Sequence, residues 1–371
     1  MKATFYVADD GLDYLNNNVF TATHFSNGLK NYLFMFADLR QQLAAAGINL
    51  ATQDIHPVEE SEVIIAIDQV TFFQTYTRRP GQRLHLIINE PATYFPEVWR
   101  RENHSVFDWV FTYDYTLANG HKYIHHYFAL DLANYPPFVP VSKADFEQRK
   151  LLVLMAGMLE LNKPRVGSPS LLYARYRTLA WFGRHWPDRF DFFSRGIEDK
   201  IYRSFPGLGL LQRVLPAAVA GRMADAVARR RRRFVESLNR GPVPANAKLR
   251  TIGQYRFAVC YENSRLPGYV SEKIFDCLFA GCVPVYLGEP DLARFIPEGC
   301  YISRASFGSD AELAAFLEWM PYTDYARYLA AIGQFLRSSE LEKFSSVANA
   351  QIITNVVLAD LELPKQYHQP L

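Results

Sequence analysis

Residues 257–288 read FAVCYENSRLPGYVSEKIFDCLFAGCVPVYLG and indicate the fold of the chain. The two ends of this stretch, 257–260 and 282–286, are short apolar runs that predict buried strands. Between them a loop leads into a helix that Ser271 can cap, and Gly281 lies where a left-handed residue commonly ends a helix. The order strand, loop, helix, strand is typical of a parallel sheet, which binds ligands at the carboxyl ends of its strands.

Polar side chains gather at that end of the predicted unit. Glu262 and Asn263 follow the first strand, and Tyr269 lies in the loop. Lys273 would add a full charge to the free N–H groups of a helix start, and this combination suits a diphosphate. The Glu272 carboxylate only accepts hydrogen bonds, so we expect sugar hydroxyls as its partners. A nucleotide-sugar presents both groups, although a helix start without any ligand also favours Ser-Glu-Lys.

The whole stretch resembles the donor-binding signature of glycosyltransferase family 10, the α-1,3/1,4-fucosyltransferases. That signature runs roughly F-E-N-S, Y-V-T-E-K-I and G-x-x-P-V-Y-x-G. The chain has YENS at 261–264, YVSEKI at 269–274 and GCVPVYLG at 281–288, a long and ungapped match. The resemblance implies that the donor is bound by Glu262, Asn263, Tyr269, Glu272 and Lys273.

The resemblance implies an α/β fold of the GT-B type, in which two Rossmann-like domains face each other across a cleft. We expect an acceptor-side domain over residues 1–140 and a donor-binding domain over 150–340. A last helix within 341–371 is expected to pack back on the first domain. Apolar runs that alternate with helical patterns support the first domain; they lie at 3–8, 63–67, 84–88 and 109–112.

The implied reaction is the inverting transfer of L-fucose from GDP-β-L-fucose to a hydroxyl of a saccharide, as in cell-surface glycans, lipopolysaccharide or capsule. The chain has no Asp-x-Asp motif for a metal-bound diphosphate. We therefore expect no cofactor and metal-independent chemistry, in which Lys273, an arginine and a helix end replace the cation. We expect no nucleic-acid partner. The alternatives are a GT-B transferase for another nucleotide-sugar, and a non-catalytic protein that binds nucleotide, membrane or nucleic acid.

Glu90 follows a strand-like run, LHLIINEP at 84–91. Family members carry a glutamate at the corresponding strand end, and FDWVFTY at 107–113 is similar to their F-D-W-V-x-T-Y segment. The resemblance implies that Glu90 is the general base. A loop glutamate bonded to nearby backbone N–H groups is the structural alternative, and Glu97 and Glu102 are the next carboxylates to test.

The sequence LYARYRTLAWF at 172–182 resembles the L-Y-x-x-R-x-x-x-I-x-W-F helix of bacterial family members. Counted back from the Trp-Phe pair, the family's arginine falls on Arg175. Arg177 competes because the spacing ahead of the arginine differs by one residue, and either side chain could lie on a solvated helix face. A guanidinium can hold a diphosphate through two parallel hydrogen bonds. Asn162-Lys163 resembles the preceding S-N-K element of the same proteins.

Residues 205–245 depart from the family pattern and predict a helical basic insertion, with leucines ahead of five consecutive arginines at 229–233. A basic amphipathic segment can lie on an anionic membrane, which would suit an enzyme that glycosylates lipid-linked saccharides. A lid that packs its leucines on the protein is the alternative.

Composition adds few constraints, since 371 residues with 49% hydrophobic content suffice for two domains and the net charge is only +2. Four cysteines at no metal-ligand spacing predict reduced core thiols. His125 and His126 would point to opposite faces of a strand, so we expect ordinary histidines. No run is long enough for a membrane span, and the first residues predict a strand and not a signal peptide. We therefore expect a bacterial enzyme of the cytoplasm, at most peripheral on the membrane.

Overall fold

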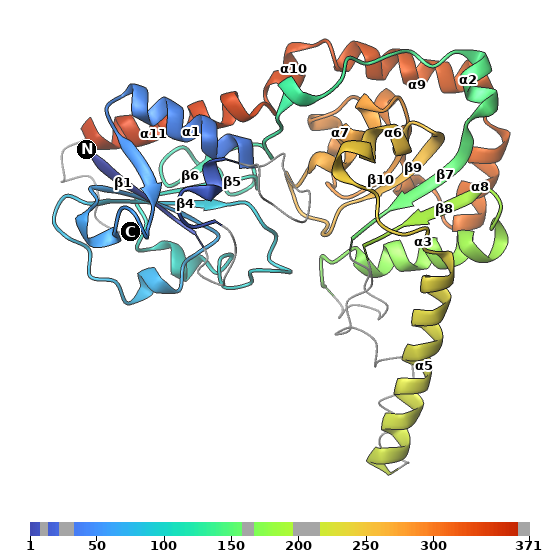
Figure 1. The fold of residues 1–371 in the computed structure, drawn as a ribbon, viewed down its shortest axis with the longest axis horizontal. Helices are drawn as coiled ribbons and strands as arrows, with labels where there is room; N and C mark the ends of the chain where they lie inside the picture. Colours follow the sequence, from blue (N-terminus) through green and yellow to red (C-terminus); the bar gives the residue numbers. More distant parts are fainter. Residues whose placement is uncertain (8–13, 22–32, 158–166, 196–215, 363–371) are drawn as a thin grey trace. The chain divides into compact units, whose positions relative to one another are not determined.

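The computed structural model describes residues 1–7, 14–21, 33–157, 167–195 and 216–362. The chain divides into two compact units (Figure 1). Unit 1 comprises Met1–Tyr135, Leu266–Glu272 and Ser338–Leu371, and unit 2 comprises Pro136–Arg265 and Lys273–Arg337. The Asn162-Lys163 pair and the first part of the predicted insertion, 205–215, lie outside the described residues.

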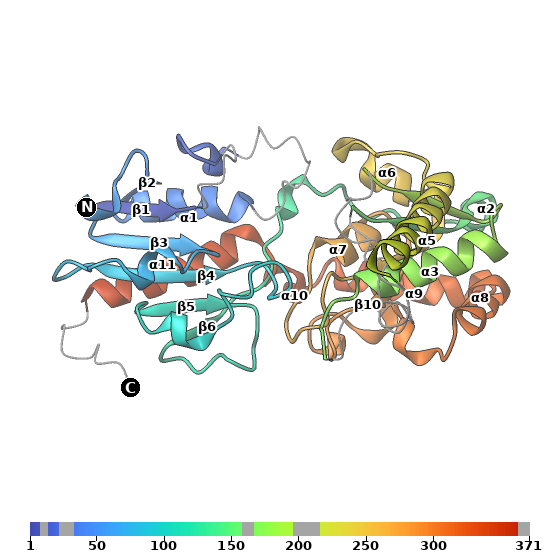
Figure 2. The same cartoon turned by 90° about the horizontal axis from the view of Figure 1, so that it is seen from below.

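Unit 1 is built on a parallel sheet with the strand order β2-β1-β3-β4-β5-β6 (Figure 2). The strands are β1 Lys2–Tyr6, β2 Asn49–Thr52, β3 Val63–Ile67, β4 Arg83–Ile88, β5 Trp109–Thr112 and β6 Tyr123–His125. The four predicted strands are therefore confirmed. The two short ones, β2 and β6, were not predicted.

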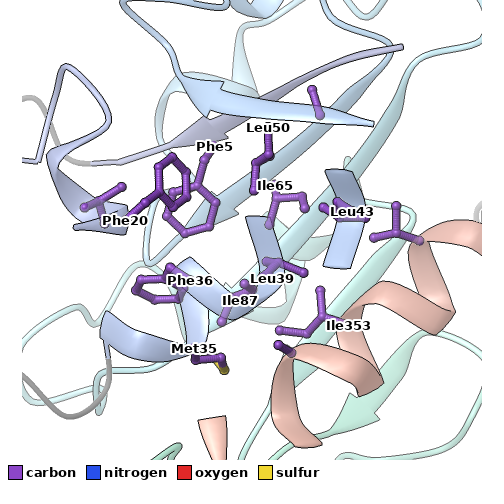
Figure 3. Packing of buried hydrophobic residues seen from close by; sticks show 14 of the residues in the cluster. Phe5, Phe20, Met35, Phe36, Leu39, Leu43, Leu50, Ile65, Ile87 and Ile353 are labelled. Carbon is purple, nitrogen blue, oxygen red and sulfur yellow. The ribbon is translucent and has the colours of Figure 1, made fainter. Parts of the chain in front are cut away.

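Both faces of this sheet are buried, because neighbouring residues of each strand point to opposite sides. On one face Phe5 and Ile65 pack against Phe36, Leu39 and Leu43 of α1 Phe34–Ala45 (Figure 3). On the other face Ile64 and Leu86 pack against Phe73 and Phe107 from the connecting loops. This two-sided burial explains why the strands read as continuous apolar runs. A left-handed glycine, Gly47, follows the end of α1.

The last helix of unit 1, α11 Ser346–Glu362, lies beside α1 and completes the first core through Ala350, Ile353 and Val357. This placement agrees with the expectation that the C-terminal helix returns to the first domain. Asp360 of α11 is also buried, and its Oδ2 lies 3.6 Å from Arg83 Nε and 3.5 Å from His85 Nε2 of β4. A buried charge cluster thus joins α11 to the strand that precedes Glu90.

Unit 2 has a second parallel sheet, in the order β11-β10-β9-β7-β8. Its strands are β7 Lys150–Met155, β8 Phe190–Phe193, β9 Tyr255–Tyr261, β10 Val283–Leu287 and β11 Ile302–Ser303. The helices not yet named are α2 Lys143–Gln148, α3 Leu172–His185, α5 Ala217–Leu238, α6 Lys248–Ile252, α7 Glu272–Phe279, α8 Asp310–Trp319, α9 Tyr322–Phe335 and, in unit 1, α10 Ser339–Glu342. The strands and the helix predicted for residues 257–288 are present as β9, α7 and β10.

Within the range predicted as a helical insertion the structure has α5, which stands away from the sheet of unit 2 in Figure 1. Its C-terminal end packs on α3, where Gly183 leaves room for Leu238 and the Arg184 guanidinium lies 4.7 Å from the centre of the Phe234 ring. None of the helices in the described ranges has the length and hydrophobicity that a membrane crossing requires.

Candidate functional site

The carboxyl end of β9 carries a buried ion pair. Glu262 follows β9 directly, is fully buried, and its Oε2 lies 3.2 Å from Lys273 Nζ in the first turn of α7. The Lys273 side chain is 26% exposed, so its ammonium reaches the surface while the Glu262 carboxylate does not. The pair is fixed because β9 and α7 enclose it. In this arrangement Glu262 acts on Lys273 and is not itself open to a ligand.

Arg175 of α3 joins the same strand end. It is buried, and both Nε and Nη2 donate to the Tyr261 carbonyl oxygen, at 3.0 and 2.6 Å. Nη2 also donates to Asn263 Oδ1 at 2.6 Å. Arg177 is exposed and has none of these contacts. Of the two arginines that the sequence left open, the structure therefore brings Arg175 together with Asn263.

Three cationic side chains border one small cavity in unit 2. The cavity has a volume of about 40 Å³ and is lined by Arg175, Lys248 and Lys273, together with residues of β7, β9, α6 and α7. Segment 169–171 pairs with the chain that follows β9: the Leu171 N–H donates to the Asn263 carbonyl at 2.9 Å, and the Arg265 N–H donates to the Pro169 carbonyl at 2.7 Å. This pairing was not predicted, because 169–171 contains no strand-like pattern.

A buried polar network lies behind β9 and was also missed. The Thr178 hydroxyl is 3.1 Å from the Tyr261 hydroxyl and donates to Asp310 Oδ1 at 3.1 Å, while Arg304 Nη2 lies 3.1 Å from the same carboxylate oxygen. Burial raises the pKa of Tyr261, so its hydroxyl stays protonated. The network joins α3 and α8 to the strand that carries Glu262.

The loop 266–272 of the signature belongs to unit 1 by its contacts. Tyr269 is buried, and its ring lies 5.1 Å from the ring of Tyr113, centre to centre, just after β5. Gly268 has φ +75°, and a side chain there would collide with the Tyr113 carbonyl, so only glycine fits. Glu272, the first residue of α7, is half-buried.

The structure also explains why two other positions of the signature are glycines. Gly281 has φ +63° and ends the α7 turn, as predicted. Gly288 follows β10 and lies against Tyr286 and Glu262, and an added Cβ would collide with both side chains. The last glycine of the signature thus leaves room for the carboxylate that pairs with Lys273.

Glu90 lies at the carboxyl edge of the unit 1 sheet, two residues after β4, and is half-buried. Its backbone N–H donates to Asp68 Oδ1 at 3.2 Å, and its carbonyl accepts from Trp99 Nε1 at 2.9 Å. Asp68 follows β3 and is buried. Its burial, together with the nearby Glu90 charge, raises the pKa of Asp68 well above its usual range. The sequence analysis did not single out Asp68 or Trp99.

The two adjacent histidines behave as ordinary side chains. His126 is buried, with Nδ1 2.9 Å from the Tyr127 carbonyl and Nε2 3.3 Å from the Ile88 carbonyl. These carbonyls favour the charged imidazolium, but burial outweighs them and lowers the pKa of His126 to about 4. His125 stacks edge-on against Tyr127. All four cysteines are buried and free, as predicted.

One segment in the C-terminal half of the chain matches a known family. Residues 225–344 match the model of glycosyltransferase family 10 (fucosyltransferase), C-terminal region. Human alpha-(1,3)-fucosyltransferase 7 is 40% identical over 95 residues, which are 25% of this chain and 28% of that protein. The bovine counterpart is 37% identical over 129 residues, 33% of this chain and 38% of that protein. A human 4-galactosyl-N-acetylglucosaminide 3-alpha-L-fucosyltransferase is 36% identical over 92 residues, 24% of this chain and 25% of that protein. The chain thus spans less than two-fifths of the length of these relatives.

The fold is similar to solved structures over nearly the whole chain. An alpha1,3-fucosyltransferase with GDP-fucose aligns with a TM-score of 0.50 at 14% identity, covering 100% of this chain and 94% of that one. An Anabaena protein, HepE, in complex with UDP-glucose aligns with a TM-score of 0.55 at 11% identity, covering 97% and 100%. These likenesses show the fold, two Rossmann-like units of the GT-B class. Residues 225–344, which match the C-terminal region of glycosyltransferase family 10 (fucosyltransferase), include Glu262, Lys273, Gly281 and Gly288.

Proposed function

We propose that this protein is an inverting fucosyltransferase that moves L-fucose from GDP-β-L-fucose to a hydroxyl of a saccharide. The observation that carries the proposal is the pair of cations, Arg175 and Lys273, that border one cavity at the end of β9. Two fixed positive charges suit the diphosphate of the donor and stabilise the GDP that leaves. Asn263 and Glu262 hold these cations in place through the contacts described above.

Glu272 and Tyr269 complete the proposed donor site. A carboxylate in the first turn of α7 accepts hydrogen bonds from hydroxyls, and the ribose and the fucose both offer them. Tyr269 fixes the loop that leads into α7, because its ring is buried against Tyr113. Glu272 would thus recognise the sugar, and Lys273, the next residue in the chain, the diphosphate.

Glu90 is the general base of the proposed reaction. Its carboxylate takes the proton of the acceptor hydroxyl as that oxygen bonds to the anomeric carbon of fucose. The bond from this carbon to the diphosphate oxygen breaks, and its electron pair leaves with GDP. One displacement inverts the anomeric centre, and no covalent enzyme intermediate is needed.

The test is a thermal-shift panel of GDP, UDP and CDP, followed by transfer assays. A ligand that binds only the folded state raises the melting temperature. We expect GDP to stabilise the wild type and to lose this effect in Lys273→Ala. We also expect GDP release from GDP-fucose to rise when 4-galactosyl-N-acetylglucosaminide is added. Stabilisation by UDP and not by GDP would favour a different nucleotide-sugar, and binding without release of GDP would favour a non-catalytic protein.

We further propose that α5 holds the enzyme on an anionic membrane. Arg222, Arg229 and Arg233 are exposed and share one face of this helix, since they follow one another at spacings of seven and four residues. The opposite face is buried through Ala220, Ala224, Ala228 and Val235. A row of exposed guanidinium groups attracts anionic headgroups by about 1 kcal/mol each. The acceptor would then be a lipid-linked saccharide.

Sedimentation with vesicles tests this attachment. The triple variant R222Q/R229Q/R233Q should lose binding to phosphatidylglycerol vesicles at low salt and keep its response to GDP. R100Q/R250Q/R327Q removes the same charge from exposed sites elsewhere and should bind as the wild type does. If the wild-type protein stays in the supernatant when such vesicles sediment, the lid is favoured. If the protein binds duplex DNA and not the vesicles, a nucleic-acid surface is favoured.

A further inference from the structure

Asp68 has a backbone conformation that is uncommon for a residue with a side chain. Its φ is +48°, and among the described residues other than glycine only Asn16 and Asn17 also have a positive φ. Aspartate and asparagine adopt this left-handed region more readily than other side chains do, but at some cost. Asp68 directly follows β3, so its conformation turns the chain at the carboxyl edge of the unit 1 sheet.

This turn places the Asp68 carboxylate on the backbone of the neighbouring strand end. Its Oδ1 accepts the N–H of Asn89 at 2.9 Å and the N–H of Glu90 at 3.2 Å. The Asp68 N–H in turn donates to the Ile87 carbonyl at 3.0 Å. Since β4 ends at Ile88, the carboxylate pairs two N–H groups that lie beyond the last strand residue. The Asp68 side chain therefore continues the hydrogen bonding between β3 and β4 as far as Glu90.

A second side chain holds the same peptide from another direction. The Trp99 indole N–H donates to the Glu90 carbonyl at 2.9 Å, and the Trp99 ring packs 5.3 Å from the ring of Tyr113. The N–H and the carbonyl of Glu90 are thus both bound by side chains. The direction in which the Glu90 side chain leaves the backbone is fixed by these two bonds.

We propose that Asp68 is a positioning residue that aims the Glu90 carboxylate at the acceptor hydroxyl. The inference rests on the proposed function, because Asp68 affects the reaction only by positioning Glu90, the proposed base. General-base catalysis requires the base within hydrogen-bonding distance of the proton that it removes, so a small rotation of the Glu90 peptide would cost turnover.

The placement of a carboxylate at this position argues for a role beyond joining two strands. Asp68 is 8% exposed and lies beside another acid, and both circumstances disfavour its charge. Left-handed backbone at a side-chain residue adds to the cost. Costs of this kind collect at functional sites, where a fixed geometry matters more than stability.

Two variants separate the hydrogen bonds of Asp68 from its backbone conformation. Asp68→Gly keeps the left-handed φ and removes the acceptor, whereas Asp68→Asn keeps both the conformation and a carbonyl acceptor. With GDP-fucose and 4-galactosyl-N-acetylglucosaminide, we expect Asp68→Gly to lower kcat by about 10- to 100-fold. Asp68→Asn should stay within about threefold of the wild type. GDP affinity, which we assign to residues that do not contact Asp68, should not change in either.

Asn17→Gly is the matched control. Asn17 also has a positive φ, and its Oδ1 accepts the N–H of Thr52 at the end of β2, at 3.0 Å. This variant removes an equivalent bond at another strand end of unit 1. It should lower stability as Asp68→Gly does and leave kcat unchanged.

The double variant Asp68→Gly/Glu90→Gln tests whether Asp68 acts through Glu90. We expect no loss of kcat beyond that of Glu90→Gln alone, because a base that is absent cannot be misplaced. Equal losses in both backgrounds, or a kcat of Asp68→Asn as low as that of Asp68→Gly, would overturn the inference. If Asp68→Gly does not fold, Trp99→Phe removes the second tether, and it should also lower kcat only when Glu90 is present.

The proposed function fails separately from this inference. Normal turnover in Glu90→Gln, or no turnover in the wild type, would refute the base and with it the role of Asp68. A large loss in Glu90→Gln with normal turnover in Asp68→Gly would refute the positioning alone.

Discussion

At the carboxyl edge of the unit 2 sheet the polar side chains bond to one another as well as to the backbone, whereas at that of unit 1 Asp68 and Trp99 bond to the backbone of Glu90. In unit 2, Lys273 pairs with Glu262, and Arg175 binds Asn263. In unit 1, Asp68 and Trp99 hold the peptide of Glu90. The first edge carries charges that other side chains hold in place, which is what the proposed diphosphate site requires. The second is a fixed backbone from which one carboxylate extends.

The difference predicts different consequences for mutations. Charges that are already in place contribute to binding before any reaction begins, so their loss should appear in affinity for GDP. A base contributes only as the proton moves, so its loss should appear in turnover.

The largest effect is expected from Glu90→Gln. Glutamine keeps the size and much of the hydrogen bonding of glutamate but has no basicity. We expect turnover to fall by a factor on the order of 10²–10⁴, with GDP affinity and melting temperature unchanged. Steady-state kinetics with GDP-fucose, together with calorimetry of GDP binding, measure both quantities.

Glu97→Gln and Glu102→Gln are the comparisons for this variant, because both carboxylates follow Glu90 in the same segment. Each should turn over as the wild type does. If turnover survives in Glu90→Gln and falls in one of these two variants, the glutamate changed in that variant is the base. The contrast between the two sheet edges would then not concern Glu90.

The second effect is expected from Lys273→Ala. Its ammonium is held by Glu262, and the side chain is 26% exposed, so we expect it to contact the diphosphate of the proposed donor. Loss of one charged hydrogen bond should weaken GDP binding by about 1.5–3 kcal/mol. Calorimetry measures the change, and Lys143→Ala, an exposed lysine of α2, is the control. Unchanged GDP affinity would contradict the assignment, and so would loss of activity in EDTA.

The unit 2 edge could be predicted from the sequence because its parts are close together in the chain. Glu262 and Lys273 are eleven residues apart, and the glycines that enclose them lie within the same stretch. Arg175 lies 86 residues before Tyr261, so only the fold could decide between it and Arg177. Asp68 acts on Glu90 from the neighbouring strand through backbone N–H groups. Such contacts require a particular backbone and no particular sequence around them, which is why no motif indicated Asp68, Trp99 or segment 169–171.

Arg175→Lys is the third prediction and tests the choice between the two arginines. Lysine keeps the charge but not the planar guanidinium that binds Tyr261 and Asn263 together. We expect GDP affinity to fall by about 1–2 kcal/mol. Arg177→Lys, on the exposed face of the same helix, should change it by less than about 0.5 kcal/mol. If both variants lose GDP affinity equally, the choice between Arg175 and Arg177 is not decided by the contacts of Arg175.

The smallest effect concerns the acid sensitivity of the unit 1 edge, where His126 is buried beside the Ile88 carbonyl. The pKa of His126 is about 4 in the folded chain, below the value near 6.5 of an unfolded histidine. Between these values the unfolded state binds the extra proton, so stability falls as pH falls. At pH 5.5 the loss should be about 1.4 kcal/mol relative to pH 8.

Hydrogen exchange, corrected for intrinsic rates, can localise this loss. Peptides that cover β4 should exchange faster at pH 5.5 in the wild type, and His126→Gln should remove part of that pH dependence. His121→Gln, at an exposed site of the same unit, should not. Peptides that cover β9 serve as the internal reference, because the described residues of unit 2 place no buried histidine there. If the exchange rate of the β4 peptides depends on pH equally in His126→Gln and in the wild type, His126 does not cause the acid sensitivity of the backbone around Glu90.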